Sequence, residues 1–239
     1  MVDKGSIIRV EYEAWTADGE LFDTTKKDVA KAQNAYHEET VYEPLPLVAG
    51  VGRVIPGFDK ALLAAKVGEE QDVTIGPADA FGERDANKVE TFSLREFQKR
   101  DMDPRPGQRI QHENRVGTVT SVTPGRVRVD FNPPLAGKTL RYKFTIKEVV
   151  ADPAAKVKTL VELNYGQGKA DGFEVEAKGD LFTIKLPDAC KYDSRWFVAK
   201  YRLVADLRAH AGAKTIRFVE EYTTEEPKAE TAEPAAPSA

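Results

Sequence analysis

The sequence has very few of the side chains that bind metals or form disulfide bonds. It contains one cysteine, Cys190, and three histidines, His37, His112 and His210, which lie far apart along the 239 residues. A single cysteine cannot form a disulfide within the chain, and a zinc site needs several Cys or His ligands at short spacing. The sequence therefore predicts no metal and no other cofactor.

Long apolar runs and an excess of basic residues are also missing. No hydrophobic stretch approaches the ~18–20 residues that a membrane-spanning helix needs, and the polar stretch Met1–Gly5 has no signal-peptide core. Lys and Arg number 35 against 39 Asp and Glu, a formal net charge of −4, which disfavours a basic nucleic-acid binder. We expect a cytoplasmic protein that binds neither membranes nor nucleic acids.

The remaining composition is that of a globular protein. Hydrophobic residues make up 41% and charged residues 31%, which argues against disorder of the whole chain. Changes of pattern along the chain indicate four parts: a first unit of residues 1–85 and 134–151, an inserted unit of 86–133, a third unit of 152–222 and a tail of 223–239. The tail is rich in Pro, Ala, Glu and Thr without bulky apolar residues, so we expect it to be disordered.

The first unit has the pattern of a β-rich domain with one helix. Val10 and Tyr12 alternate with charged residues, as in a half-buried strand, and Asp18-Gly19 is a typical tight-turn sequence. Pro56 suits a first helical position, and Phe58 begins an apolar series at helical spacing. We expect this helix to pack against the strands.

The other two units have different patterns. The inserted unit predicts short strands and carries 9 Lys or Arg against 6 Asp or Glu over residues 86–132, most simply a solvated face. The third unit predicts the order α-β-β-α-β. Trp196, Phe197 and Tyr201 lie close together on its long helix, where we expect them to form the core of this unit, with a homodimer interface as the alternative.

Three stretches, taken together, resemble the FKBP family of peptidyl-prolyl isomerases. They are Tyr12 with the sequence DGELFD at 18–23, the sequence GRVIPGF at 52–58, and AFG at 80–82 with LRY at 140–142. Each stretch alone is weak, but their order and spacing match the walls of the family's pocket. The interruption after AFG, which ends at PLAG (134–137), resembles the insert-in-flap module of SlyD-type enzymes. The added third unit resembles only the long archaeal members of the family.

The resemblance implies an α+β fold in three domains. Residues 1–85 and 134–151 would form the FKBP catalytic domain, a half β-barrel with one central helix. Residues 86–133 would form a small, β-rich chaperone domain, and residues 152–222 a C-terminal α+β domain. SlyD proteins end in a nickel-binding tail rich in His and Cys, and this tail has neither residue. No nickel role follows.

The residue types themselves suit the isomerisation of an Xaa-Pro bond. The barrier to this rotation is roughly 20 kcal/mol because the planar amide is stabilised by resonance, and no bond is made or broken. The reaction needs no nucleophile, metal or acid–base pair. It needs an apolar pocket that fits the proline ring and donors that hold the flanking backbone. Aromatic residues with one carboxylate and no histidine meet that demand.

The resemblance also implies which residues form the site. The catalytic set would be Tyr12, Asp23, Ile55, Phe81 and Tyr142, and the substrate contacts would be Phe22, Leu45, Val54, Phe58 and Leu135. The Ile55 N–H would donate to a substrate carbonyl, and Asp23 would orient the rim beside Tyr12. Phe58 replaces the Trp of well-known eukaryotic members. Phe81 replaces the usual Tyr, so one hydroxyl that contacts substrate is missing.

In this family the insert binds unfolded chains through exposed apolar side chains. The resemblance therefore implies client contacts at Val89, Phe92, Leu94, Phe97 and Met102, although these residues could also form the insert's own core. We expect a prolyl isomerase (rotamase) and folding chaperone whose partners are unfolded or nascent polypeptides that contain proline.

Other readings stay open. A non-catalytic holdase chaperone would have a vestigial pocket, and a scaffold protein would dimerise through residues 152–222. The aromatic residues of the pocket could be core residues only, and Asp23 could be only a turn cap.

Overall fold

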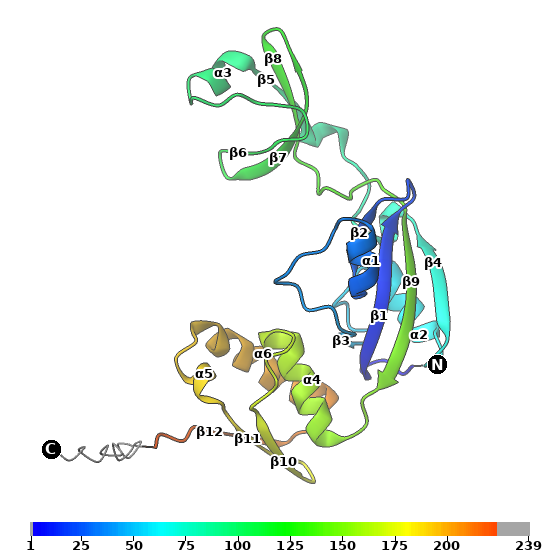
Figure 1. The fold of residues 1–239 in the computed structure, drawn as a ribbon, viewed down its shortest axis with the longest axis vertical. Helices are drawn as coiled ribbons and strands as arrows, with labels where there is room; N and C mark the ends of the chain where they lie inside the picture. The colour runs from blue at the N-terminus through cyan, green and yellow to red at the C-terminus, as the bar shows by residue number, and fades with distance from the viewer. Residues whose placement is uncertain (1, 224–239) are drawn as a thin grey trace, which may run out of the picture.

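The computed structural model describes residues 2–223 and contains three separate sheets (Figure 1). The first has the order β2-β1-β9-β4, with β3 also paired to β1, and every pairing in it is antiparallel. Its strands are β1 (Ile7–Thr16), β2 (Leu21–Thr24), β3 (Leu45–Val48), β4 (Glu70–Ile75) and β9 (Leu140–Val149). The helices of this unit are α1 (Lys27–Ala32) and α2 (Pro56–Ala64).

The first sheet buries one face, as the alternation in the sequence predicts. Burial along β1 follows a period of two, and Tyr12 and Tyr142 lie on the buried side. Helix α2 begins at Pro56, as expected, and places Phe58 and Leu62 in the same core. Within this core β1, β9 and α2 meet, and the site described below is built on them.

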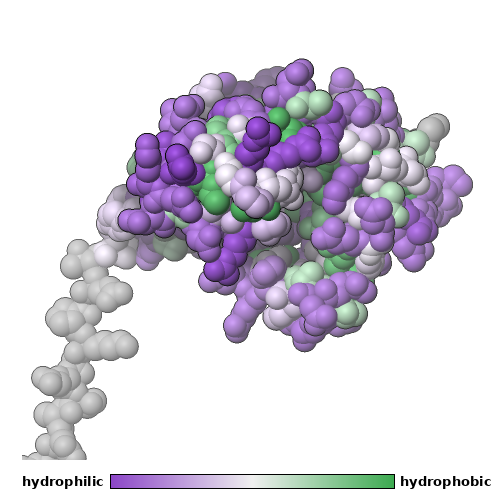
Figure 2. Space-filling view, turned by 90° about the horizontal axis from the view of Figure 1, so that it is seen from above, coloured by the Kyte–Doolittle hydropathy of each residue, from purple (hydrophilic) through white to green (hydrophobic). Residues whose placement is uncertain are grey.

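The second sheet belongs to the inserted segment and has the order β5-β8-β7-β6. Its elements are β5 (Val89–Ser93), α3 (Leu94–Gln98), β6 (Arg109–His112), β7 (Arg115–Thr123) and β8 (Arg126–Asp130), preceded by the short 3-10 helices η1 (Pro77–Asp79) and η2 (Ala86–Lys88). Its buried core is small: Phe97, Ile110, Val119, Val127 and Val129. Seen from the end that carries the insert, apolar side chains form small patches among hydrophilic ones (Figure 2).

The third sheet has the order β10-β11-β12, with β10 and β11 antiparallel and β11 and β12 parallel. Its elements are α4 (Pro153–Tyr165), β10 (Glu174–Lys178), β11 (Leu181–Lys185), α5 (Asp188–Lys191), α6 (Ser194–His210) and β12 (Thr215–Val219). The expected order α-β-β-α-β is confirmed, with the short α5 added. Asp152 caps α4 by accepting from the Ala155 N–H at 2.7 Å.

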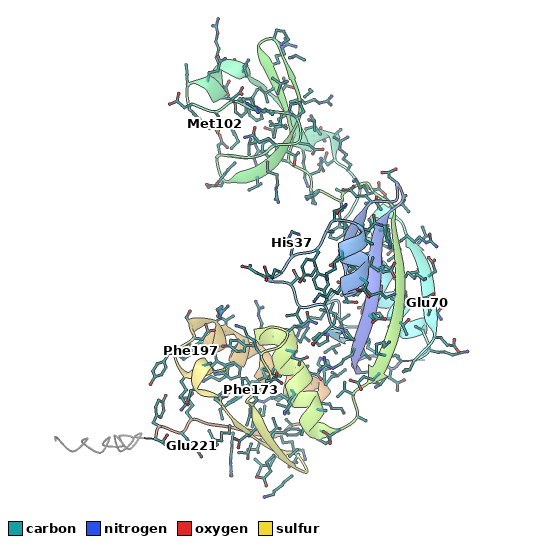
Figure 3. All side chains as sticks on the ribbon, viewed as in Figure 1. His37, Glu70, Met102, Phe173, Phe197 and Glu221 are labelled. Atoms are coloured by element: carbon teal, nitrogen blue, oxygen red, sulfur yellow. The ribbon has the colours of Figure 1, made fainter. Side chains whose placement is uncertain are left out.

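One expectation for the third unit is wrong. Trp196 is buried, but Phe197 is 62% and Tyr201 81% exposed, so these three residues do not form one core. The buried face of α6 runs through Trp196, Leu203 and Leu207, and one residue along a helix turns a side chain by about 100°. Phe197 therefore points away from the domain whereas Phe173 lies inside it (Figure 3).

The fold is mixed α+β, as expected. The disordered tail was predicted for residues that, apart from Thr223, lie outside the described part of the chain. Within residues 2–223 no helix is both long and apolar enough to cross a membrane.

Candidate functional site

An aromatic cluster lies on the buried face of the first sheet. Phe58 of α2 stacks on Tyr142 of β9, with ring centroids 4.4 Å apart, and meets Tyr12 of β1 edge-on at 6.0 Å. Phe22 of β2 contacts Tyr142 at 5.9 Å, and Phe144 lies beneath Phe58 at 5.1 Å. The register of β1 and β9 explains this arrangement, because Tyr12 lies opposite Phe144 and Tyr142 opposite Ala14. Residues that are 130 positions apart therefore share one surface.

One carboxylate lies at the edge of this cluster. The Tyr12 hydroxyl donates to Asp23 Oδ2 at 2.6 Å. Burial and the negative charge of Asp23 hold the pKa of Tyr12 far above its usual range, and the same two causes raise the pKa of Tyr142 to about 12. Both phenols are therefore neutral at physiological pH. Tyr12 can orient Asp23 but cannot supply a negative charge.

The loop before α2 forms a second edge. Gly50 and Gly52 donate their N–H groups to the Asp59 carboxylate at 2.7 and 2.8 Å, which fixes the turn between β3 and α2. Ile55 is the N-cap of α2, and within residues 2–223 no hydrogen bond uses its N–H. The half-buried side chains of Val54 and Ile55 pack on the aromatic cluster. This loop therefore presents a free backbone donor next to an apolar surface.

The remaining predicted site residues differ in depth, and among the described residues Phe81 and Leu135 belong neither to the aromatic cluster nor to the side chains packed against it. Phe22 and Leu45 are half-buried and pack on the cluster. Phe81 lies in the turn after η1 and is 40% exposed. Leu135 lies in a neighbouring turn, because the Gly137 N–H donates to the Gly82 carbonyl at 2.8 Å.

A cavity of about 150 Å³ adjoins Asp23. It lies between β2 and the segment after α1, and its lining residues are Leu21, Phe22, Asp23, Thr24, Ala35, His37, Thr40 and Tyr42. The Tyr42 hydroxyl accepts from the His37 N–H at 3.0 Å and its ring stacks on Tyr36 at 5.4 Å, so this loop has structure of its own. His37 lies on this loop (Figure 3). The sequence did not predict that the segment after α1 lines a cavity. The only indication in the sequence is the pair of tyrosines, Tyr36 and Tyr42, in an otherwise polar segment.

The client-binding residues predicted in the insert do not all reach its surface. Val89, Phe92, Leu94 and Met102 are half-buried. Phe97 is 1% exposed and lies in the insert's core, so its predicted role as an exposed contact is wrong. So small a module needs its largest side chains for its own interior. Val116, which the sequence did not single out, is 53% exposed.

Three family models match this chain in succession. The model described as FKBP-type peptidyl-prolyl cis-trans isomerase matches residues 1–97, the FKBP26 IF domain matches 92–135, and the FKBP26 C-terminal region matches 153–223. Within residues 2–223 no group of three or more His, Cys, Asp or Glu is placed to hold a metal ion.

Curated relatives agree with these matches. The short-type peptidyl-prolyl cis-trans isomerase of Methanocaldococcus jannaschii is 36% identical over 154 residues, which are 64% of this chain and 96% of that protein. The SlyD protein of Treponema pallidum, an FKBP-type peptidyl-prolyl cis-trans isomerase, is 32% identical over 147 residues, 60% of this chain and 75% of that protein. SlyD of Escherichia coli K12 is 32% identical over 154 residues, 63% and 69% of the two chains. The chain belongs to the FKBP-type peptidyl-prolyl cis-trans isomerase family.

Proposed function

We propose that this protein isomerises Xaa-Pro bonds in unfolded or partly folded proteins and that its insert captures the client chain. Residues 1–85 and 134–151 act as the catalytic domain, a half β-barrel, and residues 86–133 act as the chaperone domain. Residues 152–222 form the C-terminal domain. The observation that carries this proposal is the aromatic cluster together with the Tyr12–Asp23 hydrogen bond and the Ile55 N–H, which donates no hydrogen bond within residues 2–223.

The chemistry follows from the transition state. A twisted Xaa-Pro amide loses its resonance and becomes less dipolar across the C–N bond, so an environment poor in water favours it over the planar form. Phe58, Tyr142 and Tyr12 are only 2%, 7% and 7% exposed, and in this proposal the proline ring packs on the part of this cluster that reaches the surface. The Ile55 N–H donates to a carbonyl of the bound chain, and this contact fixes the backbone beside the rotating bond.

The edges of the surface have separate roles in this proposal. Asp23, held by the Tyr12 hydroxyl, orients the polar edge of the pocket. Phe22, Leu45 and Val54 wall the apolar part, while Phe81 and Leu135 contact the client at the outer rim. The cavity beside Asp23 has the volume for one side chain, and we assign it to a residue that flanks the proline.

The insert supplies the client contacts. Phe92, Leu94 and Met102 lie at the boundary of its small core and, together with Val89 and Val116, leave apolar surface at the outside. Exposed apolar patches of this kind are typical of protein-binding surfaces. Binding to the insert raises the effective concentration of the client's Xaa-Pro bonds at the catalytic domain. The rate of isomerisation is therefore expected to increase more for protein substrates than for short peptides.

We further propose that a second copy of the chain covers the exposed side of α6. A shallow groove is lined by apolar and aromatic side chains of α6 and β12 and by two cations: Phe197, Tyr201, Val204, Ile216, Phe218, Lys200 and Arg208. Exposed apolar side chains that gather on one face and are bordered by charged residues are typical of protein–protein contact sites. Sedimentation of the wild type and of the F197S/Y201S variant tests this. A wild type that stays monomeric at micromolar concentration contradicts the dimer.

An exchange or protease-coupled assay on an Ala-Leu-Pro-Phe peptide tests the catalytic proposal. The wild type is expected to accelerate isomerisation. Asp23→Asn is expected to lower kcat/KM about three- to tenfold, because one polar contact of the pocket weakens. Tyr165→Phe is the matched control, since the Tyr165 hydroxyl donates to Asp193 at 2.9 Å in the C-terminal domain.

Two outcomes of this assay contradict the proposal. An unchanged rate in Asp23→Asn removes that carboxylate from the site. A wild type that does not isomerise the peptide but suppresses aggregation of an unfolded protein favours a holdase with a vestigial pocket.

A further inference from the structure

An ion pair between a partly exposed arginine and a buried carboxylate joins the C-terminal domain to the loop before α2. The Arg53 Nη2 lies 2.5 Å from Asp206 Oδ1, with Arg53 in that loop and Asp206 on α6. Asp206 is only 5% exposed, and its other oxygen accepts from Asn164 Nδ2 of α4 at 2.8 Å. The carboxylate is therefore fixed by two helices of the C-terminal domain before it meets Arg53.

The position of Arg53 in the chain connects this ion pair to the candidate site. Arg53 lies two residues before Ile55, whose N–H is the free donor of the site. On the same loop, Val51 packs against the apolar core that the two domains share. On the catalytic side, Asp59 of α2 holds Gly50 and Gly52. The loop is thus held by its own domain through Asp59 and by the C-terminal domain through the ion pair of Arg53 with Asp206.

We propose that the C-terminal domain positions the catalytic loop, with Asp206 as a positioning residue that acts on the Ile55 N–H through Arg53. This inference rests on the proposed role of Ile55 in binding the client carbonyl. A buried carboxylate without its partner is costly, so the arrangement that keeps Arg53 at Asp206 is strongly preferred over alternatives. Two residues of chain transmit this preference to the N-cap of α2, where the donor lies.

A second ion pair between the same two domains serves as the matched control. Arg9 of β1 lies with Nη1 2.8 Å from Glu162 of α4, and both side chains are half-buried. Its Nε also lies 3.3 Å from Glu148 of β9. Arg9 is remote from Ile55 in sequence and belongs to a strand, not to the loop. A change at Arg9 therefore weakens the junction between the domains without altering the loop.

The experiment compares Arg53→Gln with Arg9→Gln in the full-length protein. Arg53→Gln is expected to lower kcat/KM for the tetrapeptide about three- to tenfold, while Arg9→Gln leaves it within about twofold of the wild type. The loss is expected mainly as a rise in KM, because a contact to flanking backbone holds the bound peptide in the ground state as well as in the transition state. In the 15N spectrum the Ile55 amide signal is expected to move or broaden in Arg53→Gln only.

A double-mutant cycle completes the test. Asp206→Asn alone is expected to reproduce the loss seen in Arg53→Gln, and the double variant is expected to be no worse than either single variant. Thermal unfolding of each variant separates positioning from folding, because a merely structural role lowers Tm and leaves KM unchanged.

A failure of the proposed function and a failure of the positioning role give different experimental results. An inactive wild type contradicts the proposed function. An active wild type with the same kcat/KM in Arg53→Gln and Arg9→Gln contradicts only the positioning role, and so does an additive double variant.

Discussion

The insert and the C-terminal domain are attached to the catalytic domain in different ways. The buried core of the C-terminal domain includes Ile7 of β1 and Val48 of β3, so the two domains share apolar interior. Among residues 2–223, every member of the insert's core comes from the insert itself. At its base the contacts are polar: Arg84 pairs with Asp130 at 2.6 Å, and Asn132 Nδ2 donates to the Asp85 carbonyl at 2.9 Å.

This difference indicates what each attachment can do. A shared core cannot be separated without exposing apolar side chains, so the C-terminal domain and the first sheet form one packed unit. A polar junction with two chain crossings leaves the insert as a folding unit of its own, joined at its base (Figure 1). We therefore expect changes in the insert to alter client handling and changes at the shared core to alter the stability of both neighbours.

The largest expected effect comes from deleting the insert. Removal of residues 86–132 with closure of the gap is feasible because the Asp85 N–H donates to the Asn132 side chain at 2.9 Å, so the two ends lie side by side. Tetrapeptide isomerisation is expected to stay within about twofold. Catalysed refolding of a protein limited by proline isomerisation is expected to fall about 100-fold, because the client is no longer tethered. Equal losses in the two assays would show that the insert does not act separately.

The second prediction concerns the two cores. Ile7→Ala removes buried methyl groups that both large domains share, and it is expected to cost about 2–4 kcal/mol in the free energy of unfolding. Val127→Ala, in the insert's core, is expected to cost about 1–3 kcal/mol but only in the local opening of the insert. Hydrogen exchange of amides in each domain measures both. Protection lost throughout the catalytic domain in Val127→Ala would contradict the independence of the insert.

Much of the site was predictable from local patterns. The alternation along residues 7–16 places Tyr12 on the buried face of β1, and the same pattern places Tyr142 on β9. The proline at position 56 marks the start of α2 and thereby the place of Phe58. Each of these patterns has one period and one apolar face, so it is compatible with only one assignment of buried and exposed side chains.

The burial predictions are wrong where an apolar pattern is compatible with two different buried faces. Helix α6 carries apolar side chains on two adjacent faces, and only its packing on α4 and the contact of Trp196 with Phe218 of β12 decide that Trp196 is buried and Phe197 is not. The burial of Phe97 depends on how much interior the insert needs, which no local pattern reveals. The sharing of Ile7 and Val48 with the third unit arises from contacts across more than 100 residues.

Alkaline titration offers a smaller effect that also separates the regions. The insert has no tyrosine, whereas the pKa of Tyr142 in the catalytic domain is raised to about 12 by burial and by Asp23. The neutral phenol is favoured in the folded state. This contribution to stability is therefore complete below pH 10 and is lost as pH rises from 10 towards 12. Hydrogen exchange measured at pH 9 and pH 11 reports the stability of each domain. Between these two pH values, protection is expected to fall more in the catalytic domain than in the insert. A tyrosine absorbance titration in which all eight tyrosines ionise near pH 10 would contradict it.

The smallest expected effect lies at the base of the insert. Arg84 is about half exposed where it meets Asp130, and exposed ion pairs contribute only about 0–1 kcal/mol because water and salt screen them. Arg84→Gln is therefore expected to leave Tm within about 2 °C, and tetrapeptide kcat/KM unchanged. Because the junction has few other contacts, the orientation of the insert is expected to loosen, and client refolding to slow by less than about threefold. Paramagnetic labels on the insert and on β4 measure this loosening directly. A Tm loss in Arg84→Gln as large as in Ile7→Ala would mean that the base of the insert is a packed interface, and the contrast between the two attachments would disappear.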